Sequence, residues 1–280
     1  MTPTERLSGP PDATTWRSVA APAKLTLSLR ITGIRDDGFH LLDAQMVSID
    51  LADTLTFQPG EGISVVDDVV GGLGVDGVPI GSDNLVARAL AVVGRSAAVQ
   101  IVKRIPAGAG LGGGSADAAA VLRWARSTDL ATAARLGADV PFCVWGGRAR
   151  VTGVGETIEP LPFEDRRFVL MLPPLAVDTA AVYKNWDDRR ARSGGGHAGD
   201  GPGGNELEPA AVEVAPELAQ WRDRFAEVTG QRPRLAGSGS SWFVEGDPQG
   251  LGLDDRDFLV LKDDRAPLVP VRTVPATAGS

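Results

Sequence analysis

Residues 105–119 read I-P-A-G-A-G-L-G-G-G-S-A-D-A-A, and this stretch constrains the fold more than any other part of the chain. Five of the seven residues 108–114 are glycine, and the apolar segment 99–105 leads into them. Glycine permits positive φ and has no side chain that would hold a ligand away. The amides of such a loop can converge on an anion, and the following helix adds its positive N-terminal end. The stretch therefore predicts a strand, a phosphate-binding loop and a helix over about 115–126.

Two better-known phosphate loops do not fit this stretch. No lysine follows the glycines, so it is not the G-x-x-x-x-G-K-[ST] P-loop. No acidic residue ends a second strand about 20 positions further on, as the dinucleotide-binding fingerprint requires. A flexible glycine-rich linker is the remaining alternative. The apolar strand before the loop and the alanine-rich helix after it argue against that alternative.

The composition favours a soluble protein and does not exclude a phosphorylated small molecule as its ligand. The chain has 280 residues, 43% of them hydrophobic, and a net charge of −8, which argues against nucleic-acid binding by counterion release. Cys143 is its one cysteine, and His40 and His197 are its two histidines, so neither a disulfide nor a cysteine or histidine metal site is expected. No apolar run approaches the roughly 18 residues of a membrane span, and the N-terminus lacks the apolar core of a signal peptide. We expect a cytoplasmic protein, monomer or homodimer, with no nucleic-acid or membrane partner.

Hydrophobic periodicity and turn residues predict the elements around the loop. The alternation of apolar and polar residues over 25–31 indicates a half-buried strand. Ser82 or Asp83 is expected to cap a helix. Further strands are predicted at 46–51, 53–57, 148–151 and 168–172, further helices at 130–136 and 216–229, a turn at 35–38, a loose tail at 1–17, a mobile surface loop at 189–204 and a second glycine-serine cluster at 237–241.

Three residues outside the loop are candidates for phosphoryl transfer. Lys24 begins the first alternating strand, Asp139 lies in L-G-A-D-V-P-F before an apolar strand-like run, and His40 ends the stretch D-D-G-F-H. Taken alone, each residue favours a structural role over a functional one. That role is a solvated strand end for Lys24, a helix cap or turn for Asp139, and a turn or core residue for His40. Phosphoryl transfer needs a phosphate site, a cation near the developing charge and a group that handles the acceptor proton. The loop and these residues together fit that requirement.

An ordered set of motifs resembles the GHMP kinase superfamily. The motifs are P-A-K-L-T-L, D-D-G-F-H, N-L-V, the glycine loop, L-G-A-D-V-P-F, N-E-L-E-P-A and L-A-G-S-G-S-S, over residues 20–245. The G-F-H, G-G-G-S and L-G-A-D-V-P combination resembles the branch that phosphorylates the 2-hydroxyl of 4-diphosphocytidyl-2-C-methyl-D-erythritol in non-mevalonate isoprenoid biosynthesis. The resemblance implies an α+β, two-domain fold with the active site between a ribosomal-S5-like N-terminal domain at 1–160 and a ferredoxin-like C-terminal domain at 161–280. Whether the last strand returns to the N-terminal domain is left open.

The resemblance also assigns the nucleotide end of the site. The reaction would use ATP and Mg²⁺, with a small-molecule cytidine-diphosphate alcohol as acceptor. Asp139 would be the catalytic aspartate, and Lys24 its basic partner that can hold it ionised. Whether Asp139 abstracts the proton or only orients the hydroxyl stays open, and Ser115 is a candidate magnesium ligand. The ATP-binding residues would be Asn84 and Leu85 at the adenine and, on the loop, Pro106, Gly108, Gly110, Leu111, Gly112, Gly113, Gly114 and Ser115.

The acceptor end rests on the same resemblance. Phe39 and Tyr183 would stack on the two faces of the cytosine, and His40 would hydrogen-bond its edge. Each stacked face is worth about 1–3 kcal/mol. Tyr183 is the one tyrosine of the chain, and a core residue on a short helix is the alternative interpretation. The substrate-binding residues would be Thr26, Phe39, His40, Thr179, Tyr183, Gly237, Ser238 and Gly239.

The chain departs from the superfamily pattern at two places. Thr26 stands where the pattern P-A-K-x-N has asparagine, so the contact to the methylerythritol end loses an amide. The segment between Ser115 and Asp139 is shorter than usual by about two helical turns. Two alternatives therefore stay open: another alcohol kinase of the superfamily, of the homoserine or mevalonate type, and a catalytically weak nucleotide-binding homologue.

Overall fold

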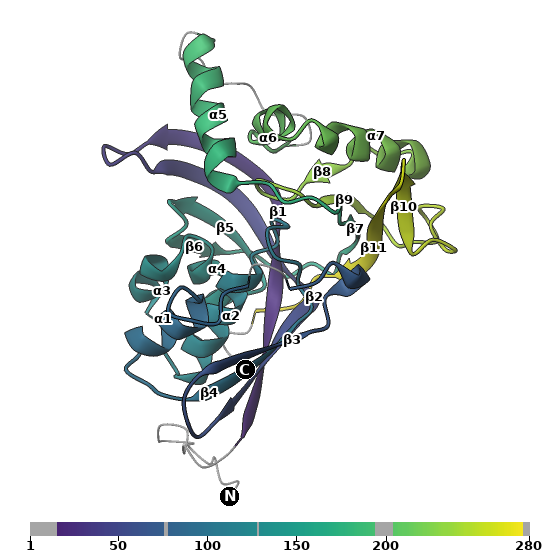
Figure 1. Ribbon diagram of the computed structural model, residues 1–280. Helices are drawn as coiled ribbons and strands as arrows, with labels where there is room; N and C mark the ends of the chain where they lie inside the picture. The colour runs from purple at the N-terminus through teal and green to yellow at the C-terminus, as the bar shows by residue number, and fades with distance from the viewer. Residues whose placement is uncertain (1–15, 76–77, 128, 194–203, 277–280) are drawn as a thin grey trace, which may run out of the picture.

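The structure, a computed structural model, describes residues 16–75, 78–127, 129–193 and 204–276. Two β-sheets lie in different parts of the molecule, each with its own helices (Figure 1). The strands of the first sheet end at residue 160, and those of the second begin at residue 167. The tail predicted at 1–17 and the surface loop predicted at 189–204 fall mostly outside the described residues. Within those residues, no helix is both long and apolar enough to span a bilayer.

The first sheet is organised around a long antiparallel hairpin. β1 (Arg17–Ile34) pairs with β2 (His40–Gln58) across the predicted turn, where Gly38 has a φ of +88°. The separate strands predicted at 46–51 and 53–57 are therefore parts of one strand. β3 and β4 pair in parallel, and the other pairs in this sheet are antiparallel. The remaining strands are β3 (Ile63–Asp67), β4 (Ala98–Lys103), β5 (Arg148–Gly153) and β6 (Thr157–Pro160), in the order β3-β4-β2-β5-β6 with β1 on β2.

The centre of β1 is buried on both faces, although its alternating sequence predicts a half-buried strand. Lys24 and Thr26 are only 5% and 2% exposed. Alternate residues of a strand point to opposite faces, so these two side chains share one face and Leu25 lies on the other. The prediction for 25–31 was wrong at Thr26, where protein covers the second face of the strand. It is confirmed over 27–31, where buried residues alternate with the half-buried Ser28 and the exposed Arg30.

Helices cover one side of the first sheet (Figure 1). α1 begins after Asn84, whose side-chain oxygen accepts a hydrogen bond from the backbone N–H of Val86 at 2.8 Å, so the predicted caps Ser82 and Asp83 were wrong. The apolar run after Asp139 forms a helix and not a strand, with Pro141 in its first turn, where the missing N–H costs nothing. The helices here are α1 (Leu85–Val92), α2 (Gly113–Trp124), α3 (Leu130–Leu136) and α4 (Val140–Trp145), with a 3₁₀ turn, η1 (Val70–Gly72).

The second sheet is antiparallel and has the order β10-β11-β7-β9-β8. α7 buries Leu218, Trp221 and Phe225, which confirms the helical spacing read at 216–229. The elements of this part are β7 (Arg167–Met171), α5 (Thr179–Arg192), α6 (Glu208–Val214), α7 (Glu217–Thr229), β8 (Arg234–Leu235), β9 (Trp242–Glu245), β10 (Phe258–Leu261) and β11 (Asp264–Arg272).

One further prediction needs correction in this part, and the last strand, whose place was left open, can now be described. α5 continues to Arg192, so the loop predicted from residue 189 begins inside a helix. Its last turn carries Arg189, Arg190 and Arg192, and basic side chains stabilise a helix C-terminus. The last strand, β11, belongs to the second sheet, and only the residues after it return to the first. There Thr273 forms an isolated antiparallel β-bridge with Ile49 of β2, and this bridge connects the two sheets.

Candidate active site

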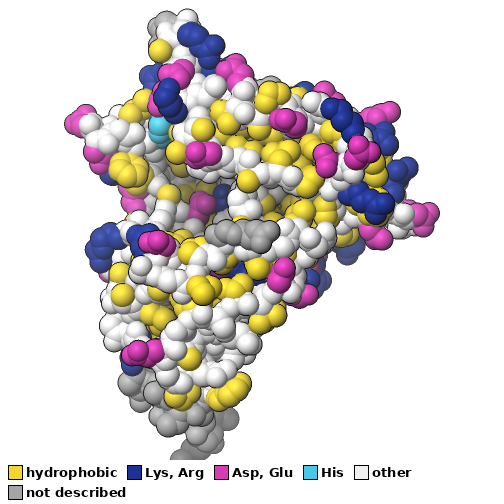
Figure 2. Space-filling view, viewed as in Figure 1, with side chains coloured by type: hydrophobic (Ala, Val, Ile, Leu, Met, Phe, Trp, Pro, Cys, Tyr) yellow, Lys and Arg dark blue, Asp and Glu magenta, His cyan; other side chains and the backbone are white. Residues whose placement is uncertain are grey.

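A cavity of about 570 Å³ lies between the parts that carry the two sheets. The space-filling view shows the surface hollowed there (Figure 2). Of the site residues predicted from the sequence, the cavity is lined by Lys24, Thr26, Asn84, Leu85, Pro106, Gly108, Gly110, Gly112, Gly113, Gly114, Ser115, Asp139, Thr179, Tyr183, Gly237 and Ser238. The predicted residues outside its lining are Phe39, His40, Leu111 and Gly239.

The glycine loop closes one side of this cavity and needs glycine for two separate reasons. Gly112 has a φ of +70° and occupies the N-cap position of α2, where no side chain caps the helix. The first-turn amides of α2 are therefore available to an anion in the cavity. Gly110 has a φ of +75°, and a Cβ there would overlap with the carbonyl oxygens of Ala236 and Gly239. The second glycine-serine cluster thus packs directly against the first.

Lys24 and Asp139 meet at the floor of the cavity. Lys24 Nζ lies 3.3 Å from Asp139 Oδ2 and donates a hydrogen bond to Thr26 Oγ1 at 3.2 Å. The Lys24 side chain is 6% exposed and that of Asp139 30%, so the solvated strand end was the wrong interpretation for Lys24. Asp139 does occupy a helix N-cap position, but its side chain makes no capping bond. The backbone N–H of Lys24 donates to the carbonyl of Leu111 at 3.0 Å, which fixes the strand against the glycine loop.

A buried charged cluster that the sequence did not reveal lies beneath the loop. Lys103 binds Asp53 and Asp117, the latter at 2.8 Å, and all three side chains are almost completely buried. Asp53 also accepts the backbone N–H groups of Arg104 and Ile105 at 2.6 and 2.8 Å. Burial raises the pKa of Asp117 to about 7, helped by the charge of Asp53 and opposed by that of Lys103. Two features of the sequence could have revealed this cluster. They are a lysine at the last position of an apolar strand and an aspartate inside an alanine-rich helix.

The predicted cytosine end has a different geometry from the one expected. Tyr183 lines the cavity from α5, and its ring lies 4.8 Å from that of His40 at an angle of 40°. His40 lies behind it, with Nε2 2.9 Å from Asp187 Oδ1. Phe39 is 59% exposed, and its ring faces the Arg35 guanidinium at 5.3 Å. The Tyr183 ring thus packs beside His40, and the predicted cytosine sandwich between Phe39 and Tyr183 stays a prediction.

The environment of Tyr183 also bears on its alternative interpretation. Burial raises the pKa of its phenol above the ordinary value, with a smaller contribution from the negative charge of Asp139. α5 has 14 residues, so Tyr183 is not on a short helix. The ring is partly buried and faces the cavity, and it lies close enough to Asp139 to feel its charge. Tyr183 is therefore neither a fully buried core residue nor an exposed one.

Asn84 shapes the opposite end of the cavity. Its side chain caps α1 and also donates from Nδ2 to the carbonyl of Pro79 at 2.6 Å. The residue therefore holds the segment before α1 against the helix start. Leu85 follows and lines the same wall, and a Cβ at Gly114 would lie 3.5 Å from its Cδ1. This end of the cavity therefore lies next to the first turn of α2.

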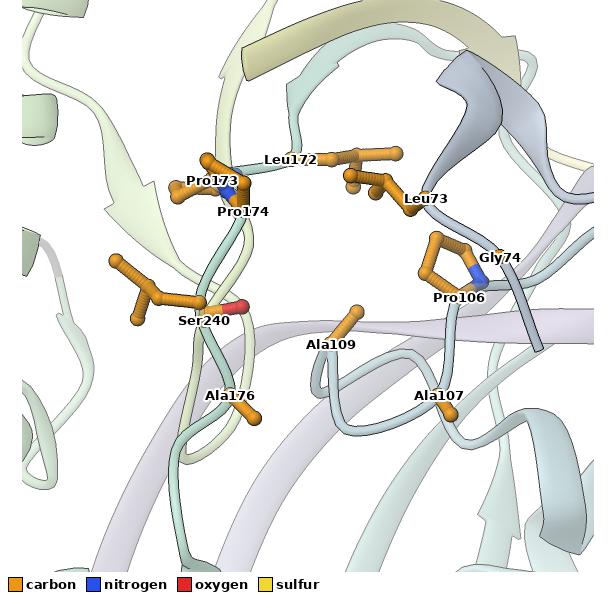
Figure 3. A pocket seen from close by; sticks show the side chains of 11 residues that line it. Leu73, Gly74, Pro106, Ala107, Ala109, Leu172, Pro173, Pro174, Ala176 and Ser240 are labelled. Carbon is orange, nitrogen blue, oxygen red and sulfur yellow. The ribbon is translucent and has the colours of Figure 1, made fainter. Parts of the chain in front are cut away.

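A second, smaller cavity of about 230 Å³ lies on the other side of the loop entrance. Pro106, Ala107 and Ala109 line both cavities. Figure 3 shows these side chains facing Pro173, Pro174 and Ala176, which follow β7. No charged side chain lines this second cavity within the described residues, so the larger cavity is the one suited to phosphates.

The described residues contain no group of three or more histidine, cysteine, aspartate or glutamate side chains that could hold a metal ion. Cys143 is buried, and burial raises the pKa of its thiol to about 12. The Ser115 hydroxyl lines the larger cavity in the first turn of α2. Mg²⁺ is commonly held by one or two protein oxygens together with substrate phosphates and water. The donors present therefore fit a metal ion that arrives with a nucleotide.

The chain is similar to known proteins over most of its length. The family model "GHMP kinases N terminal domain" matches residues 84–147. The 4-diphosphocytidyl-2-C-methyl-D-erythritol kinase of Paracoccus denitrificans (strain Pd 1222) is 36% identical over 244 residues, which cover 81% of this chain and 86% of that protein. A crystal structure of 4-(cytidine 5'-diphospho)-2C-methyl-D-erythritol kinase matches with a TM-score of 0.67 and 31% identity, over 92% of this chain and 100% of that chain. A crystal structure of mevalonate kinase, with a TM-score of 0.57 and 12% identity over 92% of this chain and 99% of that one, shares the fold alone.

Proposed function

The chain belongs to the 4-diphosphocytidyl-2-C-methyl-D-erythritol kinase family of the GHMP kinases, and from this premise we propose how its residues carry out the reaction. The protein is an ATP-dependent small-molecule kinase. It transfers the γ-phosphoryl group of ATP to the 2-hydroxyl of 4-diphosphocytidyl-2-C-methyl-D-erythritol, a step of non-mevalonate isoprenoid biosynthesis, and we assign this reaction to the cytoplasm. The N-terminal domain at 1–160 binds ATP, and the C-terminal domain at 161–280 contributes the acceptor end.

The single observation that carries this proposal is the Lys24–Asp139 pair beside the first turn of α2. The pair brings one cation and one carboxylate to the point where the glycine loop meets the strand. In phosphoryl transfer the acceptor oxygen attacks the γ-phosphorus, the bond to the β-phosphate oxygen breaks, and the hydroxyl proton must leave. Asp139 orients the hydroxyl and accepts that proton, and Lys24 offsets the negative charge that gathers on the transferred group.

The nucleotide occupies the end of the cavity next to α1. Its phosphates accept hydrogen bonds from the amides of Gly108–Ser115, which converge on the uncapped start of α2. Asn84 and Leu85 line the adenine pocket, with Asn84 acting through the helix start that it caps. Supporting this placement, Leu85 and Pro79 line the wall of the cavity here beside Asn84.

The acceptor occupies the end of the cavity formed by α5 and the second glycine-serine cluster. Cytosine stacks on the ring of Tyr183, with His40 at its edge and Phe39 as the proposed second face. Thr179 Oγ1 and Ser238 Oγ lie 2.8 Å apart and offer two hydroxyls toward the diphosphate. Thr26, in place of the family asparagine, is engaged by Lys24, so it contributes to the alcohol end mainly by holding that lysine.

Magnesium would be held by the Ser115 hydroxyl together with the phosphates of ATP. Bound there, the ion would neutralise phosphate charge in the transition state. No step assigned to Lys24 or Asp139 depends on a further protein ligand for the ion.

The test is a direct assay with ATP, Mg²⁺ and a set of alcohols, followed by phosphorus NMR. The expected result is a new phosphomonoester signal with 4-diphosphocytidyl-2-C-methyl-D-erythritol and none with homoserine or mevalonate. Turnover with homoserine or mevalonate instead would assign the protein to another acceptor. ATP binding without turnover on any alcohol would contradict the kinase assignment for this chain and favour a nucleotide-binding homologue.

A further inference from the structure

The N-E-L-E-P segment at 205–209 belongs to the resemblance but has no role in the reaction described above. Its first residue, Asn205, is 3% exposed. It lies between β1 of the first sheet and the second glycine-serine cluster at 237–241. This cluster together with Ala236 is here called the 236–241 loop. A polar side chain buried this completely must satisfy its hydrogen bonds within the protein.

The Asn205 carboxamide is fully engaged, and two of its bonds reach the 236–241 loop and the strand before it. Nδ2 donates to the carbonyl of Leu235 at 2.9 Å and to the carbonyl of Gly237 at 2.7 Å. Oδ1 accepts the backbone N–H of Leu207 at 3.0 Å, which shapes its own segment. The amide hydrogens are thus used on β8 and on the loop that follows it, and the amide oxygen is used within the Asn205 segment.

The backbone of the same segment is held to β1. Asn205 forms a parallel bridge with Leu29, and the N–H of Glu206 donates to the carbonyl of Leu29 at 2.9 Å. Glu206 adds a second connection, because its Oε2 accepts the N–H of Ile31 at 2.9 Å. The segment therefore connects the strand that carries Lys24 to the loop on the other side of the cavity.

The loop that Asn205 holds is in contact with Lys24 and with the glycine loop. A Cβ at Gly237 would lie 3.3 Å from Lys24 Nζ, so the loop backbone packs directly on the lysine. Ser241 donates from its hydroxyl to the carbonyl of Ala109 at 2.7 Å. A small shift of the loop would therefore move the wall against which Lys24 rests.

We propose that Asn205 is a positioning residue for phosphoryl transfer: its carboxamide fixes the 236–241 loop relative to Lys24 and the glycine loop. Its kinetic consequence rests on the function proposed above, since the loop borders the acceptor. Asn205 itself touches neither substrate. Misplacement of a reacting group by about 1 Å can cost on the order of 100-fold in rate, so one lost anchor is expected to be measurable.

The test compares two variants of Asn205 with a matched control. Asn205→Asp keeps the size of the side chain and the acceptor for Leu207, but it can supply at most one of the two hydrogens used on Leu235 and Gly237. Asn205→Ala removes all three bonds. Glu206→Gln is the control, because Glu206 is equally buried, lies in the same segment, and keeps an acceptor for Ile31 as glutamine.

Two measurements are made on each folded variant. Hydrogen exchange, followed by mass spectrometry, reports on the amides of the 236–241 loop, where Gly239 and Ser241 donate to Ala236 and Ala109. Steady-state kinetics give kcat and KM for each substrate. Both Asn205 variants should exchange faster in the loop, raise the acceptor KM and lower kcat/KM for the acceptor about 10- to 100-fold. ATP affinity should change by less than about threefold, and Glu206→Gln should resemble the wild type.

The outcomes separate this inference from the proposed function. Wild-type exchange and kinetics in folded Asn205→Asp would overturn the positioning role. Equal losses in Glu206→Gln, or unfolding of both Asn205 variants, would assign the residue to general stability and overturn it as well. If the wild type does not phosphorylate the cytidine-diphosphate alcohol, the proposed function fails. The exchange comparison still tests the inference in that case, because it needs no acceptor.

Discussion

Gly112 lies against the Lys24–Asp139 pair so closely that a Cβ on this glycine would be 2.9 Å from Lys24 Cγ and 3.7 Å from Asp139 Oδ2. The residue that begins the phosphate-binding helix therefore also packs on the proposed catalytic lysine. The proposed phosphate site and the proposed acid-base pair are therefore packed against each other, and a change in either is expected to affect the other.

Asp139→Asn should remove most of the phosphoryl transfer and leave ATP binding nearly unchanged. The amide has the same size as the carboxylate but cannot accept the acceptor proton, and general-base assistance is typically worth about 10²- to 10⁴-fold. Steady-state kinetics with calorimetric ATP titration would measure both quantities. Turnover close to that of the wild type would show that Asp139 is not the catalytic aspartate.

Lys24→Ala should lower kcat more than it raises the KM for ATP. The ammonium acts on charge that develops in the transition state, and such a loss appears in kcat. The Lys24→Ala, Asp139→Asn double variant should lose less than the product of the two single losses, because the side chains are in direct contact. Lys184→Ala, a lysine whose side chain is 77% exposed, is the control and should be silent. An effect confined to the ATP KM would make Lys24 a binding residue only.

Gly112→Ala should be damaging, whereas Gly114→Ala should be tolerated. Gly112 has a φ of +70°, which costs an L-residue about 1–2 kcal/mol, and its Cβ would press on Lys24. Gly114 lies in the helix without a positive φ, and its Cβ would make only an ordinary 3.5 Å contact with Leu85. We expect at least about a tenfold loss of kcat/KM in Gly112→Ala and less than about threefold in Gly114→Ala. Similar activities in the two variants would contradict the packing described above.

Tyr183→Ala should raise the KM for the cytidine-diphosphate alcohol. The substitution removes one base–aromatic stack, which is worth about 1–3 kcal/mol of binding free energy. ATP affinity should not change, because the adenine pocket lies at the other end of the cavity. Tyr183→Phe keeps the ring and should be almost silent. Normal use of the substrate by folded Tyr183→Ala would remove the support for cytosine stacking at this residue.

The free energy of unfolding should depend on pH through the carboxyl group of Asp117. Its pKa is raised to about 7 in the folded protein, while the unfolded chain has an ordinary aspartate pKa near 4. The folded state therefore binds an extra proton between these values, and its stabilisation is present below about pH 4 and lost as the pH rises to about 7. The free energy of unfolding of the wild type minus that of Asp117→Asn should fall across this window in denaturant titrations. A constant difference would show that Asp117 is ionised in the folded protein throughout.

Locally encoded features were predicted well from the sequence. The 130–136 helix, the turn at 35–38 and the strands at 148–151 and 168–172 were found because each depends on its own periodicity or turn residues. The motif set gave the family and the two-domain α+β fold, both of which the comparisons confirm. Two of the errors were local as well: basic residues at the end of α5 resembled a loop, and a short buried helix after Asp139 resembled a strand.

By itself the sequence determined the glycine loop, because positive φ at Gly108, Gly110 and Gly112 is a property that almost only glycine allows. The tertiary structure alone decided which side chains that loop would meet. Lys24 is buried because protein covers both faces of β1 at this residue, the Tyr183 ring packs beside His40, and Lys103 binds two aspartates from other elements. Each of these contacts joins residues far apart in the chain. Long-range pairing is fixed by the packing of whole sheets and helices, which no local pattern records.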